Sequence, residues 1–226
     1  GGIFGEGLGR RLEHRHVALG ERLERTALER AGQRLAELVV VAAGLSAAAE
    51  DEARAIAPNL RWIALPVACD RATLRNLALA QATGDHVVFP DAGDRALPGR
   101  LQRQAALLAA RPDLDIVGCW SETPAGLLTY AQRHDEIVAE ALGSEPLRLS
   151  ACLVRRSFLD RTGVRHDPEF AVHDGLQMLC RCIVAGARFA VTPELLHRAV
   201  PVKPPANPAH AASLAMRARR AVLRHL

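Results

Sequence analysis

Two kinds of segment, which differ in their pattern of apolar and polar residues, alternate along much of the chain. Short continuous apolar runs, typical of strands buried on both faces, occupy residues 38–44, 60–67, 85–90 and 114–120. Between them, apolar residues recur every three or four positions, as in amphipathic helices, over residues 21–37, 47–57, 71–84 and 97–113. This alternation predicts an α/β domain in which crossover helices connect the strands of a parallel sheet.

The second half of the chain has a different pattern. Helices are predicted near residues 134–142 and over 173–187, a strand running into a helix over 146–160, and a final strand pair over 188–200. A proline-rich linker follows at 201–209. We therefore divide the chain into a poorly ordered or truncated segment (1–20), a main domain (21–200), and a linker with a C-terminal helix (201–226).

The C-terminal helix is basic and amphipathic. Its apolar side carries Leu214, Ala218, Val222 and Leu226. Two interpretations stay open: docking on the main domain, which we favour, or peripheral contact with an anionic membrane surface. A larger parent chain or a homo-oligomer is also compatible with this sequence.

Composition further limits the classes of protein to which the chain can belong. The net charge is +4, but 28 of the 29 basic residues are arginine and only Lys203 is lysine, a bias that fits genomic base composition better than a nucleic-acid surface. The five cysteines show no zinc spacing and are expected to be buried in a reducing compartment. No apolar run approaches the roughly 20 residues of a membrane span, and no signal peptide is evident. A cytoplasmic protein without a nucleic-acid partner is predicted.

Carboxylates at element ends are the candidate functional groups. Asp91 directly follows the apolar run at 85–90, and ligands of open parallel sheets bind beyond the carboxyl ends of strands. Asp91 and Asp94 together suit a divalent cation with a diphosphate, although Asp94 equally suits the cap of the next helix. Asp174, at the start of helix 173–187, suits either a general base or an N-cap.

Four segments in order resemble a known family. They are ELVVVAAGLS (37–46), LRNLALAQATGDHVVF (74–89), FPDAGDRALPGRL (89–101) and TGVRHDPEFAVHDGLQMLCRCIVAGARF (162–189). Their order and spacing are similar to those of family-two glycosyltransferases, which are inverting enzymes with nucleotide-sugar donors. The resemblance covers about residues 22–198. It implies the GT-A fold, a Rossmann-like α/β architecture with a mixed, mostly parallel sheet flanked by helices.

The resemblance also implies roles for individual residues. Asp174 corresponds to the catalytic base, Asp91 to the first aspartate of the DxD element, and Asp94 to the acidic residue after it. Arg75 and Asn76 correspond to the pair beside the nucleotide. Asp91 and Asp94 would hold a divalent cation, Mn²⁺ or Mg²⁺, and the accessory candidates are Arg181, His173 and His197. The acceptor would be a glycan, lipid or protein, as in bacterial-type polysaccharide biosynthesis.

Several expected acidic ligands are replaced. Ala42 and Ala43 stand where the family has aspartates, Gly93 stands at the second aspartate of DxD, and His173 stands at the glutamate before the base. Gly93 in particular weakens the prediction of a cation. An active glycosyltransferase is our first hypothesis, and a catalytically degenerate GT-A domain that acts as a binding or scaffolding module is the alternative. A nucleotide-binding α/β protein of another class is third, because no P-loop is present and the early GEGLG follows no clear strand.

Overall fold

The computed structural model of the chain describes residues 38–43, 50–51, 54–55, 60–67, 69–91, 94–170, 173–199 and 206–226. The helix predicted over residues 21–37, the segment 1–20 and Gly93 lie outside the described residues, as does most of 47–57. The division into a segment, a domain and a C-terminal extension therefore stays a prediction.

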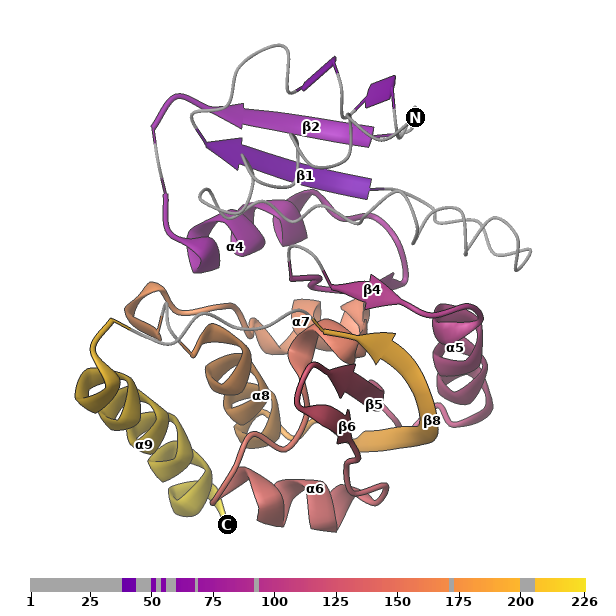
Figure 1. Cartoon of the computed structure of the whole chain (residues 1–226), viewed down its shortest axis with the longest axis vertical. Coiled ribbons are helices and arrows are strands. Elements are labelled where there is room, and N and C mark those ends of the chain that lie inside the picture. Colours follow the sequence, from indigo (N-terminus) through magenta and orange to yellow (C-terminus); the bar gives the residue numbers. More distant parts are fainter. Residues whose placement is uncertain are drawn as a thin grey trace.

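The first described strands form a small parallel sheet. Strands β1 (Leu38–Ala43) and β2 (Leu60–Leu65) pair in parallel along their whole length. Val41 packs with Leu74 of helix α4 (Arg71–Gln81), and α4 lies directly beneath the two strands (Figure 1). The predicted succession of a strand by a helix is therefore confirmed for β2 and α4, while the helix predicted over residues 47–57 stays a prediction.

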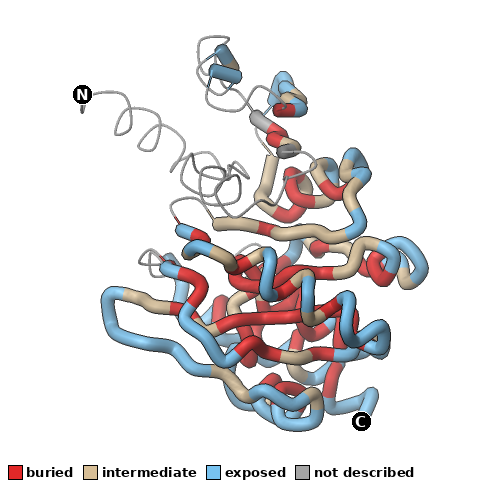
Figure 2. The backbone as a smooth tube through the Cα atoms, turned by 90° about the vertical axis from the view of Figure 1, so that its right-hand side faces the viewer, coloured by how far each residue is buried: buried red, intermediate tan, exposed pale blue. Residues whose placement is uncertain are grey.

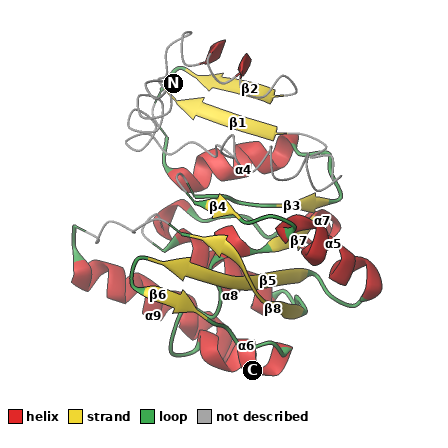
Figure 3. Cartoon of the chain, turned by 45° about the vertical axis from the view of Figure 1, so that its right-hand side comes forward, coloured by secondary structure: helices red, strands yellow, loops and turns green. Residues whose placement is uncertain are grey.

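The second sheet is larger and mixed. Its strand order is β3–β7–β5–β8–β4, with β6 paired to β5 (Figure 3). The strands are β3 (His86–Val87), β4 (Arg95–Ala96), β5 (Ile116–Thr123), β6 (Gly126–Leu128), β7 (Leu153–Arg155) and β8 (Phe189–Arg198). β5 and β8 run parallel, while the other described pairs of this sheet are antiparallel.

The α/β class with a mixed sheet is thus confirmed, although the described part is less parallel than predicted. One cause is the two-residue connection between β5 and β6, because such a short turn joins only antiparallel strands. In addition, the strand pair predicted over residues 188–200 is the single strand β8. It pairs with β5 on one side and β4 on the other.

Both faces of this sheet are covered by helices. The remaining helices are α5 (Arg100–Ala110), α6 (His134–Ala141), α7 (Arg156–Thr162), α8 (Asp174–Val184) and α9 (Pro208–His225), with short 3₁₀ turns at Leu149–Ala151 and Pro168–Phe170. Neighbouring residues of β5 point to opposite faces: Ile116 joins the main core with α6, α7, α8 and α9, while Val117 packs with Leu108 of α5. Figure 2 shows the buried residues gathered toward the interior, with exposed residues around them. Burial on both faces explains why the strand sequences are continuously apolar.

The C-terminal helix α9 is docked on the domain beside α8 (Figure 1). It begins earlier than the pattern indicated, because the Asn207 side chain accepts a hydrogen bond from the His210 N–H and Pro208 opens the first turn. Leu214, Ala218 and Val222 are buried as predicted, whereas Leu226 is 71% exposed. The docking interpretation is therefore correct for three of the four predicted contacts. None of the helices in the described ranges has the length and apolar character needed to cross a bilayer.

Candidate functional site

Helix α4 presents two arginines from its first turns. The helix starts at Arg71 because the carboxylate of Asp70 accepts hydrogen bonds from the N–H and the hydroxyl of Thr73, at 2.9 and 2.6 Å. Arg71 and Arg75 are four positions apart and therefore lie on the same face of the helix. Asp70 is thus the residue that fixes the beginning of this helix.

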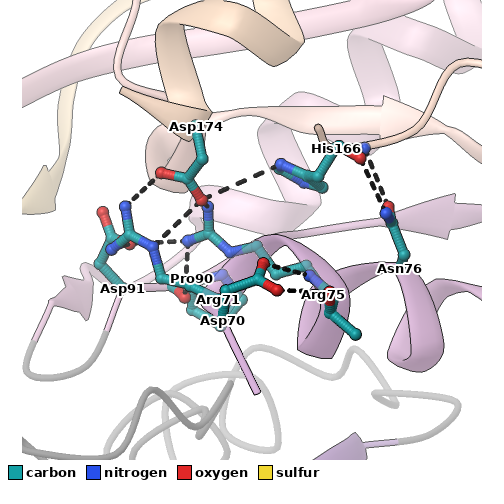
Figure 4. Close-up of polar contacts among 9 residues, drawn as sticks. Asp70, Arg71, Arg75, Asn76, Pro90, Asp91, His166 and Asp174 are labelled. Atoms are coloured by element: carbon teal, nitrogen blue, oxygen red, sulfur yellow. Dashed lines mark hydrogen bonds and ion pairs between the residues drawn. The ribbon is translucent and has the colours of Figure 1, made fainter. Parts of the chain in front are cut away.

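Asp174 meets both arginines at the start of α8. Arg71 Nε donates to Asp174 Oδ2 at 3.0 Å and Arg75 Nη1 donates to the same oxygen at 2.5 Å, while Arg71 Nη2 donates to Oδ1 (Figure 4). The side chain is 1% exposed. The N-cap position of α8 belongs to His173, so Asp174 does not act as the helix cap that was one of its two predicted roles.

Asp91 completes this cluster. It lies in the segment after β3, and its Oδ1 accepts hydrogen bonds from Arg75 Nη2 at 2.7 Å and Arg71 Nη1 at 3.1 Å. Its side chain is 26% exposed, so one side of the cluster reaches solvent. Arg71, Arg75, Asp91 and Asp174 are called the ion-pair cluster below, and Figure 4 shows the two carboxylates on either side of the guanidinium groups.

The charges within the ion-pair cluster stabilise one another. Burial by itself raises the pKa of Asp174, but the positive charges of Arg75 and Arg71 outweigh it and hold the pKa below its ordinary value. Burial likewise opposes the charge of Arg71, yet Asp174 and Asp91 raise the pKa of its guanidinium above the ordinary value. The cluster therefore combines two basic side chains with two acidic ones.

Asn76 ties α4 to the backbone of His166. Asn76 Nδ2 donates to the His166 carbonyl at 2.8 Å, and the His166 N–H donates to Asn76 Oδ1 at 2.9 Å. The His166 ring is buried edge-on against Phe89, and its Nδ1 lies 3.9 Å from Asp174 Oδ2. Burial, followed by the charge of Arg75, lowers the pKa of His166 to about 3, so the ring is neutral at physiological pH. Both polar groups of the Asn76 side chain are thus engaged by backbone, and its predicted contact with a nucleotide stays a prediction.

Asp94 belongs to a second polar network. Its Oδ2 accepts a hydrogen bond from Ser150 Oγ at 2.7 Å and lies 3.2 Å from His197 Nε2, while His197 Nδ1 lies 3.1 Å from Ser121 Oγ. All four residues are buried. The N-cap of α5 is Gly99, with φ of 80°, so Asp94 does not cap that helix either. The structure thus pairs two predicted site residues, Asp94 and His197, with each other.

The remaining accessory candidates lie apart from these contacts. His173 is half-buried at the N-cap of α8, and burial together with the charge of Arg219 lowers its pKa. Arg181 is largely exposed, and its Nη1 lies 3.6 Å from Asp167 Oδ2. In the described part of the chain, the hydrogen bonds and ion pairs given above do not link either residue to Asp174 or Asp91.

No protein-family model matches the chain, and no curated protein matches it in sequence. Its structure, however, is similar to several solved ones. TarS 1–349 from S. aureus in complex with UDP-GlcNAc superposes with a TM-score of 0.61 at 17% identity, over 78% of this chain and 52% of that one. The mannosyltransferase PcManGT from Pyrobaculum calidifontis, in complex with GDP-Man and Mn²⁺, superposes with a TM-score of 0.54 at 18% identity, over 83% of this chain and 65% of that one. Glucosyl-3-phosphoglycerate synthase from Mycobacterium tuberculosis, in complex with Mn²⁺, UDP and phosphoglyceric acid, superposes with a TM-score of 0.59 at 18% identity, over 92% of this chain and 75% of that one.

The chain has the GT-A fold. This confirms the fold that the sequence resemblance implied. The chain spans about half the length of the TarS fragment that it matches, at 52% of that chain.

Among the described residues, Asp91 and Asp94 do not form a joint site for a divalent cation. Asp91 Oδ1 accepts from two guanidinium groups, so a cation bound there would lie against two positive charges. Asp94 is directed to Ser150 and His197 instead. Within the described ranges, no three histidine, cysteine or acidic side chains gather into a group suited to a metal. The geometry thus gives no support to Asp91 and Asp94 as joint metal ligands.

Arg71 is the site residue that the sequence interpretation missed. The resemblance pointed to Arg75 and Asn76 but gave no role to the arginine four positions earlier. A signal was available, because Asp70 and Thr73 mark the start of a helix and place Arg71 one turn before Arg75 on the same face. His166 was missed as well, since a buried histidine has no local signature in the sequence.

Proposed function

We propose that the chain is an inverting glycosyltransferase that moves a sugar from a nucleotide-diphosphate donor to an acceptor hydroxyl. One observation carries the proposal. Asp91 and Asp174, which come from separate segments, converge on the same two guanidinium groups at the start of α4 in a GT-A fold. The buried carboxylate suits the deprotonation of a nucleophile. The guanidinium groups between the two carboxylates suit the binding of an anionic leaving group.

Asp174 is the general base in this proposal. It takes the proton of the acceptor hydroxyl, whose oxygen forms a bond to the anomeric carbon of the donor sugar. The bond from that carbon to the diphosphate oxygen breaks on the opposite face, and the nucleoside diphosphate leaves with the electron pair. A single displacement of this kind inverts the anomeric centre. The lowered pKa keeps Asp174 ionised, and therefore able to accept a proton, at any pH near neutrality.

Asp91, Arg75 and Asn76 are assigned to the donor side. Asp91 is the more exposed carboxylate of the ion-pair cluster, so it is accessible to a ribose or sugar hydroxyl. Arg75 is 4% exposed and bound to both carboxylates, which makes it the fixed part of the cluster. Asn76 holds the backbone of His166, whose ring Nδ1 lies 3.9 Å from Asp174 Oδ2, and this segment is proposed to line the donor side.

The wider setting of the reaction is also proposed. The acceptor is a glycan, a lipid or a protein, as in cytoplasmic steps of bacterial-type polysaccharide biosynthesis. The chain is proposed to act within a larger protein or a homo-oligomer.

Donor turnover tests the proposal. The protein is incubated with UDP- and GDP-sugars, and release of UDP or GDP is followed by chromatography, while binding of the same compounds is measured by calorimetry. Asp174→Asn is expected to lower turnover by about two to four orders of magnitude, the usual contribution of a general base, with donor binding retained. Asp113→Asn, which removes an exposed carboxylate paired with Arg111, is the matched control and should leave both unchanged.

Two results would contradict the proposal. If Asp174→Asn turns over the donor as fast as the wild type, Asp174 is not the base. If no nucleotide or nucleotide-sugar binds at all, the chain is instead the degenerate GT-A domain that acts as a binding module.

A further inference from the structure

Arg71 differs from Arg75 in a way that matters for ligand binding. Its side chain is 32% exposed, against 4% for Arg75, and it is the first residue of α4. It binds both carboxylates at once, with Nη1 on Asp91 and with Nε and Nη2 on Asp174. Arg71 is therefore the member of the ion-pair cluster that an incoming anion can reach.

Both carboxylates keep a cationic partner if Arg71 turns away. Arg75 Nη2 remains on Asp91 at 2.7 Å and Arg75 Nη1 remains on Asp174 at 2.5 Å. Neither buried charge would be left alone, so the exchange of Arg71 between partners avoids the large cost of an unpaired buried ion. The arrangement thus contains one fixed guanidinium and one that is free to change its partner.

We propose that Arg71 binds the donor diphosphate and takes the place that a divalent cation holds in metal-dependent GT-A sites. This inference rests on the function proposed above. A guanidinium group stays positively charged at all relevant pH values, and its planar fork of N–H donors matches two phosphate oxygens at once. As the bond to the anomeric carbon breaks, negative charge builds up on the diphosphate, and a fixed cation beside it lowers the barrier.

The same exchange couples donor binding to the base. When Arg71 moves from Asp174 to the diphosphate, Asp174 loses one of the two cations that depress its pKa, and it becomes a stronger base. Without a donor, Arg71 and Arg75 both neutralise Asp174. The base is therefore fully active only when the donor is bound.

Calorimetric titration with UDP, GDP and their sugars tests the inference. The wild type is titrated in excess EDTA and again with manganese, and the affinities are expected to agree within about twofold, which is less than 0.5 kcal/mol. Arg71→Gln should bind about tenfold to a hundredfold more weakly in EDTA, the range for losing hydrogen bonds to a charged group. Arg111→Gln, which removes an exposed arginine paired with Asp113, is the matched control and should bind like the wild type.

A second variant provides a readout that a purely structural role would not change. Asp174→Asn removes the carboxylate that competes with the diphosphate for Arg71, so the nucleoside diphosphate should bind severalfold more tightly. Circular dichroism and melting temperature establish that each variant is folded.

The possible outcomes separate the inference from the function on which it rests. Binding that requires manganese, or an Arg71→Gln variant that binds like the wild type, would overturn the role of Arg71 and leave the proposed glycosyltransferase intact. An absence of nucleotide binding in both EDTA and manganese would overturn both.

Discussion

Asp174 is expected to contribute to the stability of the fold as well as to catalysis, and Asp174→Asn tests this directly. The carboxylate accepts hydrogen bonds from Arg71 and Arg75, and both the Asp174 and Arg75 side chains are almost completely buried. The asparagine keeps the size and one acceptor oxygen but removes the negative charge. The arginines then face a neutral partner in a buried site, which leaves positive charge without compensation.

The magnitude follows from the burial of each partner. Loss of one partner of a buried ion pair costs about 3–5 kcal/mol. The lower end applies here, because Asp91 still pairs with both arginines and because Arg71 is about one-third exposed, so solvent screens part of its contribution. We expect the free energy of unfolding to fall by about 3 kcal/mol. With a urea m-value of about 2–3 kcal/mol/M, the midpoint should move down by about 1 M.

Urea unfolding followed by circular dichroism at neutral pH measures this change. Asp113→Asn serves as the control, since its carboxylate pairs with Arg111 on the surface, and its midpoint should match that of the wild type. A double-mutant cycle with Arg75→Met then separates the pair from its surroundings, and the two changes together should cost less than their sum. An Asp174→Asn protein with an unchanged midpoint would refute the reasoning, because it would mean that Asp174 is not held by the arginines in solution.

Three further changes test other parts of the structure. Asn76→Ala removes both hydrogen bonds to the His166 backbone and should lower the free energy of unfolding by about 2 kcal/mol, as measured by urea titration. An unchanged urea midpoint would mean that α4 is not tied to the segment around His166. Leu214→Ala should lower the free energy of unfolding by about 3 kcal/mol, because the side chain is on the buried face of α9. Leu223→Ala, at a position of the same helix that is 56% exposed, should change the melting temperature little, and equal effects would argue against the docking of α9. Folding lowers the pKa of His166 from 6.5 to about 3. Between these two pH values the unfolded chain binds a proton that the folded chain does not, so the free energy of unfolding falls as the pH is lowered. His166→Phe should reduce this loss between about pH 7 and about pH 5, and an identical pH dependence in the variant would mean that His166 is not the acid-sensitive group.

Much of the local structure could be predicted because its causes are local. The apolar periodicity of residues 71–84 and 173–187 located α4 and α8, since burial of one helix face repeats every three to four positions. The strand predicted over residues 85–90 is the two-residue strand β3 (His86–Val87), which pairs antiparallel with β7, so Asp91 lies four positions beyond its end rather than at the carboxyl end of a parallel strand. The sheet pairing was less predictable, because a run such as residues 188–200 does not record which strands it will join.

The partners of the polar residues depended on tertiary structure. Arg75 and Asp174 are 99 residues apart in the sequence, and nothing near either residue indicates that they form an ion pair. For the same reason Asp94 and Asp174 could be interpreted as helix caps, until the folded chain directed one to Ser150 and His197 and the other to two arginines.

The sequence by itself determined the approximate location of most described helices and strands and which of their faces are apolar. Only the tertiary structure decided that Arg71 joins Arg75 between Asp91 and Asp174, and that the predicted pair of metal-binding carboxylates is divided between two networks. The physical reason is the range of the forces involved. Helix capping and hydrophobic periodicity act over a few neighbouring residues, whereas the pairing of buried charges is set by which distant segments the packed core brings together.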